Sequence, residues 1–175
     1  MIEKKIKSRI IFQGKVIKVK CDDVVLENGV TTKREIVEHI GGACCLVKTK
    51  NEEIIFVSQY RYSLGIDVLE LPAGKLEVGE DPLTTIRREL EEEVGVVAEV
   101  VTELGYILPT PGYSSEKIYL YYVDSYHNCD SNFDFDENLT VRYIPIKKVY
   151  EMVANGEIVD AKTICLLLKC QVFLM

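Results

Sequence analysis

One central segment repeats its apolar residues every three or four positions, the spacing that places them on one face of a helix. Asp81 is a favourable N-cap residue, and Pro82 suits the first position of a helix. Gly95 fits the position just beyond a helix end. We therefore predict a helix between Asp81 and Gly95, with an apolar face formed by Leu83, Ile86, Leu90 and Val94.

Much of the remaining chain alternates apolar and polar residues or holds short apolar runs, as strands do. Asn28-Gly29 is a strong hairpin signal, so residues 8–38 predict a small antiparallel sheet. Helices are predicted over residues 146–154 and from 161 to about 174, the second capped by Asp160. The predicted strands cover residues 15–20, 23–26, 31–37, 43–47, 54–60, 67–71, 97–106, 117–124 and 140–144.

This order of strands and helices predicts an α/β sandwich with a mixed sheet. Gly41-Gly42 marks a break after the N-terminal strands. We expect an N-terminal antiparallel β extension over residues 1–40 and a main domain over residues 41–175. The polar and acidic residues 128–138 predict a mobile loop.

The overall composition limits the kinds of molecule that the protein is expected to bind. The chain of 175 residues has a net charge of −7, which disfavours binding to nucleic acid because phosphate neutralisation needs lysine and arginine patches. No apolar run approaches the roughly 20 residues that a membrane span needs, so no membrane partner is expected. Six cysteines occur without a Cys-x-x-Cys pair, so no zinc site is expected. Four of them lie in apolar runs, where free cysteine behaves as a small apolar residue, which indicates reduced thiols and a cytoplasmic location.

The predicted central helix carries an unusually dense group of carboxylates: Glu89, Glu91, Glu92 and Glu93. Like charges at this spacing repel one another and weaken a helix. At about 100° per residue, Glu89 and Glu93 share a second face, with Glu92 beside them. A hard divalent metal ion held by carboxylate oxygens would offset the repulsion. The alternative is an acidic helix face that is only solvated.

The spacing of residues from Gly74 to Val96 resembles the Nudix box. This resemblance implies an α/β/α sandwich and hydrolysis of a nucleoside diphosphate linked to another group. It implies a Mg²⁺ site, with Mn²⁺ as an alternative, in which Arg88 orients Glu89. It implies that Gly74 is needed for a turn of the backbone, and that Glu80 has a structural role or a role outside the direct ligands of the metal. The implied metal ligands are Glu89, Glu92, Glu93 and the carbonyl oxygen of Ala73.

The flanking segments are similar to the ADP-ribose pyrophosphatase branch of the same family. They are residues 33–39, Gln59-Tyr60-Arg61, residues 70–74, residues 109–116 with Pro111, and residues 159–163. This similarity implies cleavage of ADP-ribose to AMP and ribose 5-phosphate by a homodimer in which the N-terminal sheet helps to form the interface.

The same similarity implies a set of substrate-binding residues: Arg34, Glu35, Arg61 and Glu70. Arg61 would bind the diphosphate or the terminal ribose, and its alternative is a surface salt bridge. Arg34 and Glu35 would reach the adenine or the phosphates, and their alternative is an ordinary cross-strand charge pattern.

The catalytic base is left between two glutamates, because bases of this family often come from a flexible loop outside the box. Glu137 precedes the strand predicted at residue 140, and Glu116 follows the proline-rich segment. For either residue, plain solvation in a loop is the alternative. Two rival functions share the fold: removal of damaged nucleoside triphosphates, and nucleotide binding without catalysis. The usual sign of the second rival is loss of a box glutamate, and none is lost here.

Overall fold

The computed structural model describes residues 2–130 and 139–174. Contacts between Cα atoms group the chain into two compact units. The first contains residues 1–41 and 108–117, and the second contains residues 42–107 and 118–175. The first unit thus includes a segment from the middle of the chain in addition to the expected N-terminal extension. The boundary near residue 40 as a division into domains stays a prediction. Of the loop predicted over residues 128–138, Asn128 is instead the last residue of a strand, and residues 131–138 lie outside the described residues.

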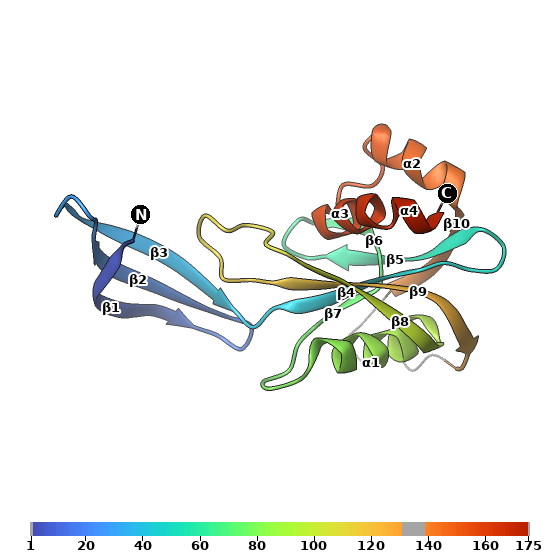
Figure 1. The fold of residues 1–175 in the computed structure, drawn as a ribbon, viewed down its shortest axis with the longest axis horizontal. Coiled ribbons are helices and arrows are strands. Elements are labelled where there is room, and N and C mark those ends of the chain that lie inside the picture. Colours follow the sequence, from blue (N-terminus) through green and yellow to red (C-terminus); the bar gives the residue numbers. More distant parts are fainter. Residues whose placement is uncertain (1, 131–138, 175) are drawn as a thin grey trace. The chain divides into compact units, whose positions relative to one another are not determined.

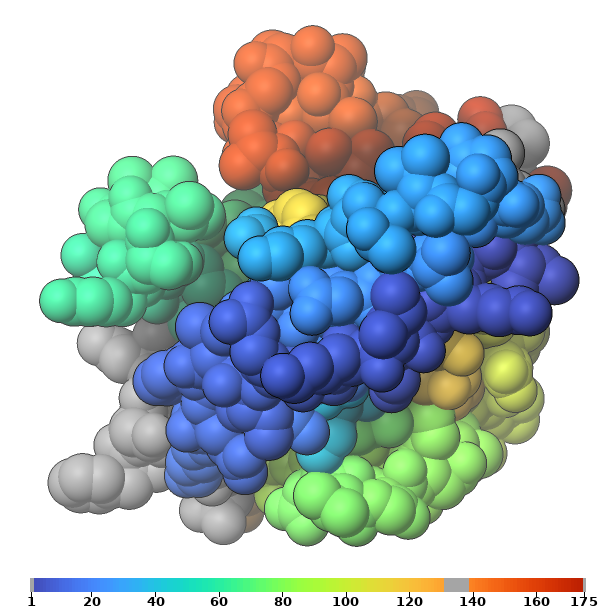
Figure 2. Space-filling view, turned by 90° about the vertical axis from the view of Figure 1, so that its left-hand side faces the viewer, coloured from blue at the N-terminus to red at the C-terminus, as the bar shows by residue number. Residues whose placement is uncertain are grey.

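The first unit is built on an antiparallel sheet with the strand order β1-β2-β3. β1 covers Lys4–Gln13, β2 covers Ile17–Val25 and β3 covers Thr31–His39. The sheet begins at Lys4, ahead of the expected residue 8, and the two short strands predicted over residues 15–26 form the single strand β2. Every residue of β1 is exposed, and Figure 2 shows its dark blue atoms on the surface.

The turn at Asn28-Gly29 forms as predicted. Gly29 has a φ of 82°, a backbone conformation that glycine adopts without steric cost. The backbone N–H of Leu26 donates to the carbonyl of Val30 at 2.9 Å and closes the hairpin. At the other end of the sheet, the segment 108–117 binds β3, because the N–H of Val37 donates to Tyr113 O at 2.8 Å.

The second unit contains two sheets with the strand orders β7-β4-β9-β8 and β10-β5-β6. Among the described strands of this unit, β4 and β9 run parallel and the other neighbours are antiparallel, so the four-stranded sheet is mixed. The strands are β4 (Gly42–Val47), β5 (Glu53–Arg61), β6 (Ile66–Glu70), β7 (Ala73–Lys75), β8 (Val96–Ile107), β9 (Ile118–Asn128) and β10 (Leu139–Pro145).

Helices cover both faces of the second unit. α1 (Pro82–Val94) lies on one face, and α2 (Ile146–Ala154), α3 (Ala161–Lys169) and α4 (Gln171–Leu174) lie on the other (Figure 1). β4 is buried along its whole length because its alternate side chains enter two different cores. Cys44 and Leu46 join the core under α2–α4, and Cys45 and Val47 join the core under α1. This is the predicted α/β/α sandwich with a mixed sheet.

The C-terminal helix is shorter than predicted. α3 ends at Lys169, and a separate turn, α4, follows instead of one helix to residue 174. The Phe173 ring in α4 stacks on Tyr122 with 4.8 Å between ring centroids. The sequence contains no glycine or proline between α3 and α4 that would have predicted the break. Within the described residues, no helix is both long and apolar enough to cross a membrane.

Candidate active site

The acidic residues are carried by α1, whose ends form as the sequence predicts. The Asp81 side chain accepts a hydrogen bond from the N–H of Leu83 at 3.1 Å. Gly95 closes the helix in the left-handed conformation, with a φ of 63°. Ile86, Leu90 and Val94 are buried as expected, but Leu83 is 36% exposed because it lies in the first turn, at the edge of the core.

The second face of α1 is also buried rather than open to solvent. The glutamates on it, Glu89 and Glu93, are only 8% and 3% exposed. Both side chains face the backbone where the loop after β6 continues into β7. The N–H of Ala73 donates to Glu93 Oε2 at 3.2 Å. A carboxylate is costly to bury, so two of them on one buried face indicate a site for positive charge and not a solvated helix surface.

Gly74 allows the close approach of this loop to α1. A Cβ atom placed on Gly74 would lie 1.9 Å from Oε1 of Glu89 and 2.0 Å from its carboxyl carbon. The Glu89 carboxylate therefore occupies the space that any side chain at position 74 would need. This is the physical reason for a glycine at the start of the box.

Arg88 binds the carboxylates on its own helix. Its Nη1 atom is 3.0 Å from Glu89 Oε1 and 2.9 Å from Glu92 Oε2, and its Nε atom is 3.6 Å from Glu80 Oε1. Partial burial alone would lower the pKa of Arg88, but the charges of Glu89 and Glu92 hold that pKa above its usual value. Arg88 thus contacts Glu89 as predicted, and it also fixes Glu92.

Glu80 has a structural role at the start of α1. Its Oε2 atom accepts from the N–H of Glu77 at 3.0 Å and from the Thr85 hydroxyl at 2.8 Å. These hydrogen bonds, led by the one from Glu77, lower the pKa of Glu80 and keep it ionised. Glu80 therefore ties the segment before α1 to the first turns of the helix.

The loop before Gly74 is held from the opposite side of the sheet as well. The Thr163 hydroxyl accepts from the N–H of Leu71 at 2.9 Å, and the N–H of Cys45 donates to Pro72 O at 2.9 Å. Antiparallel pairing of Ala73 with Cys44 continues this support. The backbone around the Ala73 carbonyl is consequently fixed by β4, α1 and α3 together.

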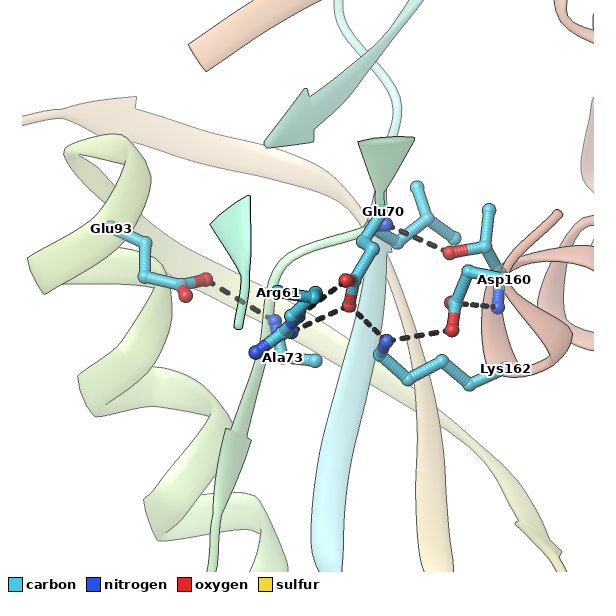
Figure 3. A network of polar contacts seen from close by, with 8 residues as sticks. Arg61, Glu70, Ala73, Glu93, Asp160 and Lys162 are labelled. Atoms are coloured by element: carbon cyan, nitrogen blue, oxygen red, sulfur yellow. Dashed lines mark hydrogen bonds and ion pairs between the residues drawn. The ribbon is translucent and has the colours of Figure 1, made fainter. Parts of the chain in front are cut away.

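A second charged cluster lies on the far side of the same loop (Figure 3). Arg61, at the end of β5, donates from Nε to Glu70 Oε1 at 2.6 Å and from Nη2 to Glu70 Oε2 at 2.7 Å. Lys162, in the first turn of α3, donates to the same Oε2 atom. Its Nζ atom also lies 3.0 Å from Oδ1 of Asp160. We call these four residues the Arg61 cluster.

The charges of the Arg61 cluster support one another. Burial alone would raise the pKa of Glu70, but Arg61 and Lys162 hold it below its usual value. Burial alone would lower the pKa of Lys162, but Asp160 and Glu70 keep it raised. Arg61, Glu70 and Lys162 are therefore charged near neutral pH.

The carboxylates of α1 match a hard divalent cation in ligand type and in burial. Glu89 and Glu93 are buried beside the Ala73–Gly74 backbone, and Glu92 is held next to Glu89 by Arg88. Oxygen ligands of this kind suit Mg²⁺ and Mn²⁺. Across residues 2–130 and 139–174, no three such side chains already converge as a complete cation cage, so binding would require small side-chain rotations.

Comparison with known families agrees with this geometry. The sequence matches the NUDIX domain over residues 38–167, which includes the whole of α1 and the loop before it. The chain belongs to the Nudix family. It is a Nudix hydrolase, and members of this family generally depend on divalent metal ions.

The similarity to individual known proteins extends over nearly the full chain. A methanol dehydrogenase activator from Bacillus methanolicus is 39% identical over 164 residues, covering 93% of this chain and 89% of that protein. An ADP-ribose pyrophosphatase from Bacillus subtilis is 37% identical, covering 92% and 88% of the two chains. A solved structure of an ADP compounds hydrolase has a TM-score of 0.87 and 19% identity, covers 99% of this chain and 95% of that one, and shares the fold.

The structure places the remaining predicted residues in the first unit of this Nudix protein or outside the described chain. Arg34 makes a two-point ion pair with Glu3, at 2.9 and 2.7 Å. Glu35 lies on the other face of β3, where it lines a cavity of about 580 Å³. Glu116 lies 3.5 Å from His39 Nδ1. Glu137 lies outside the described residues, so the roles predicted for these residues stay predictions.

Sequence reasoning assigned no role in the site to two residues of the Arg61 cluster, Lys162 and Asp160, although it predicted Asp160 as the cap of α3, and its side chain does accept from the N–H of Thr163. They lie about a hundred positions from Arg61 in the sequence and approach it because α3 packs against β4, β8 and β9. The sequence signal that could have identified Lys162 is a lysine in the first turn of a helix, where the helix dipole disfavours a cation.

Proposed function

We propose that this Nudix hydrolase cleaves the diphosphate linkage of ADP-ribose, or of a related ADP-sugar, to AMP and a sugar phosphate. The observation that carries this proposal is the pair of buried glutamates, Glu89 and Glu93, packed against the Gly74 loop. The similar ADP-ribose pyrophosphatase from Bacillus subtilis supports the choice of substrate. GDP-mannose pyrophosphatase of Escherichia coli, 30% identical over 145 residues, supports the broader class of nucleoside diphosphate sugars.

The metal proposed for the site is Mg²⁺, with Mn²⁺ as the alternative. Glu89, Glu92, Glu93 and the Ala73 carbonyl would hold it. When bound, such an ion neutralises phosphate oxygens and makes a water molecule a better nucleophile. Arg88 contacts Glu89 and Glu92, and the loop contacts fix the backbone at Ala73 beside Glu93.

Binding of the substrate and removal of a proton from water would be carried out by side chains of the protein. Arg61 keeps its Nη1 atom free of hydrogen bonds to any described residue, and a guanidinium suits phosphate oxygens. We assign it to the substrate diphosphate. Glu137, or alternatively Glu116, would take the proton from the attacking water. A base in a loop needs to reach the water only in the closed complex.

A panel of nucleoside diphosphate sugars and nucleoside triphosphates tests the proposal, with product formation measured in Mg²⁺ and in chelator. We expect metal-dependent hydrolysis that favours ADP-ribose. Glu93→Gln should lower kcat/KM about 10³-fold, the size typical of losing a group that stabilises charge in the transition state. Glu91→Gln, on the exposed face of the same helix, is the matched control and should retain activity.

Each alternative result has a defined meaning. Preference for triphosphates would retain the site and reject the substrate. Full activity of Glu93→Gln would reject the site. Binding of nucleotides without turnover of any of them would favour a binding module.

We also propose that the protein is a homodimer joined through the N-terminal sheet. The outermost strand, β1, pairs along one edge with β2, has no strand of the described chain on its other edge, and exposes Ile6, Ile10 and Phe12. An exposed apolar edge strand is a site at which a second chain can pair. Light scattering should give twice the chain mass of 19.9 kDa, and a value of 19.9 kDa would contradict the proposal. Six free cysteines support a reducing, cytoplasmic location, which cell fractionation tests.

A further inference from the structure

Lys162 occupies a position that is unfavourable for a lysine considered alone. Its side chain is only 14% exposed, and it lies in the first turn of α3, near the positive end of the helix dipole. Burying an ammonium group is costly unless carboxylates compensate for it. The local stability of α3 therefore does not explain this residue, and the explanation must come from the groups that it contacts.

Those groups lead directly to Arg61. Glu70 Oε2 accepts from both Lys162 Nζ and Arg61 Nη2, and Glu70 Oε1 accepts from Arg61 Nε. Lys162 thus fixes the rotation of the Glu70 carboxylate, and the two-point contact transmits that orientation to the guanidinium plane. With Nε and Nη2 committed, the direction of Nη1 is set by Lys162 through Glu70.

The cluster also has a defined charge. Arg61 and Lys162 carry two positive charges, and Glu70 and Asp160 carry two negative charges. Loss of the Lys162 charge would leave a net charge of −1 on a cluster that borders Glu93, whose charge already acts on Arg61. An anionic diphosphate would be repelled by that excess charge, whereas a metal cation would not.

We propose that Lys162 is a positioning residue that acts through Glu70 to orient Arg61 and to keep the cluster neutral, so that Arg61 can receive an anionic diphosphate. The proposal deepens the function proposed above and rests on it. A cavity of about 340 Å³, lined by residues that include Arg61, Ser63, Glu70 and Lys162, adjoins the cluster and gives a ligand access to it.

Steady-state kinetics on ADP-ribose tests this role with three variants. Lys162→Met should raise KM about tenfold and change kcat less than threefold, because it removes an interaction that acts on substrate binding. Lys162→Arg restores the charge and should recover most of the affinity. Lys169→Met, at the exposed end of the same helix, removes the same charge and serves as the matched control.

A double-mutant cycle separates positioning from a general structural effect. If Lys162 acts through Arg61, then Lys162→Met should raise KM less than twofold in an Arg61→Met background, because interacting residues are not additive. The half-saturating Mg²⁺ concentration should not increase in Lys162→Met. Additive effects on KM, or weaker Mg²⁺ binding, would overturn the proposal.

A spectroscopic measurement makes the test independent of turnover. The Nε–H resonance of Arg61, identified by its absence from Arg61→Met, should shift in Lys162→Met and return in Lys162→Arg. If no substrate in the panel is hydrolysed, the proposed function fails, but this resonance still decides the positioning role. An unchanged resonance would overturn it. If Lys162→Met does not fold, Lys162→Gln tests the neutrality of the cluster, because it removes the charge of Lys162: KM for ADP-ribose should still rise, and an unchanged KM would overturn the proposal.

Discussion

Two clusters of arginine and glutamate lie on either side of the loop that carries Ala73 and Gly74, and they differ in charge balance. On α1, Arg88 is the one cation that contacts Glu80, Glu89 and Glu92 in the described part of the chain. In the Arg61 cluster, two cations face two carboxylates. The first cluster has excess negative charge that an added cation can neutralise, whereas the second is already complete.

This difference has a chemical consequence. Carboxylates that repel one another store unfavourable energy in the protein, and a bound cation releases it. A balanced buried network instead loses stability when one member is removed, because the remaining charges are left uncompensated. We therefore assign metal binding to the cluster on α1 and orientation of a substrate-binding group to the Arg61 cluster.

Replacing one glutamate by glutamine in each cluster should give the largest difference between them, measured as the change in the free energy of unfolding. Glu70→Gln leaves Arg61 and Lys162 without their shared carboxylate and should lower the free energy of unfolding by about 2 kcal/mol, below the full cost of a broken buried ion pair because Arg61 is 38% exposed. Glu93→Gln relieves repulsion and should leave the stability of the metal-free protein unchanged or higher. Urea denaturation in chelator measures both.

Glu91→Gln serves again as the reference for removing one exposed glutamate charge. If Glu93→Gln proved the more destabilising of the two core substitutions, the assignment of excess charge to the cluster on α1 would be wrong.

A smaller effect is expected from adding Mg²⁺ to the folded protein. At ten times its dissociation constant, a ligand that binds only the native state adds about 1.4 kcal/mol. For a chain of this size that corresponds to a rise in Tm of about 3–5 °C. Glu93→Gln should lose most of this rise, while Glu70→Gln should retain it because the Arg61 cluster holds no metal. Equal Tm shifts in the two variants would remove the distinction between the clusters.

The structure of α1 illustrates what local sequence can predict. Its N-cap, its first proline, its closing glycine and its apolar row depend on residues a few positions apart, and the structure confirms them except at Leu83, which is exposed. The predicted α/β sandwich with a mixed sheet followed from similar local patterns, and its α/β/α arrangement was implied by the resemblance to the Nudix family. The break between α3 and α4 was not predicted, because it depends on Phe173 stacking on Tyr122, about fifty positions earlier in the chain.

The predicted substrate-binding residues show the opposite case. Arg61 and Glu70 were both selected from the sequence, and the structure brings them together at 2.6 Å. Arg34 and Glu35 are adjacent in the sequence but lie on opposite faces of β3, because side chains alternate along a strand. The similarity to the ADP-ribose pyrophosphatase branch identified these four positions, but it did not predict which of them lie on the same surface.

By itself, the sequence determined the Nudix box, the helix that carries it and the glycine that its glutamates require, because these depend on residue spacing within a few turns. Only the tertiary structure decided that Glu89 and Glu93 are buried and that Lys162 completes the Arg61 cluster. Those facts depend on β4, β6, α1 and α3 converging on one loop. Such convergence follows from long-range packing of two cores, and no local pattern of residues encodes it.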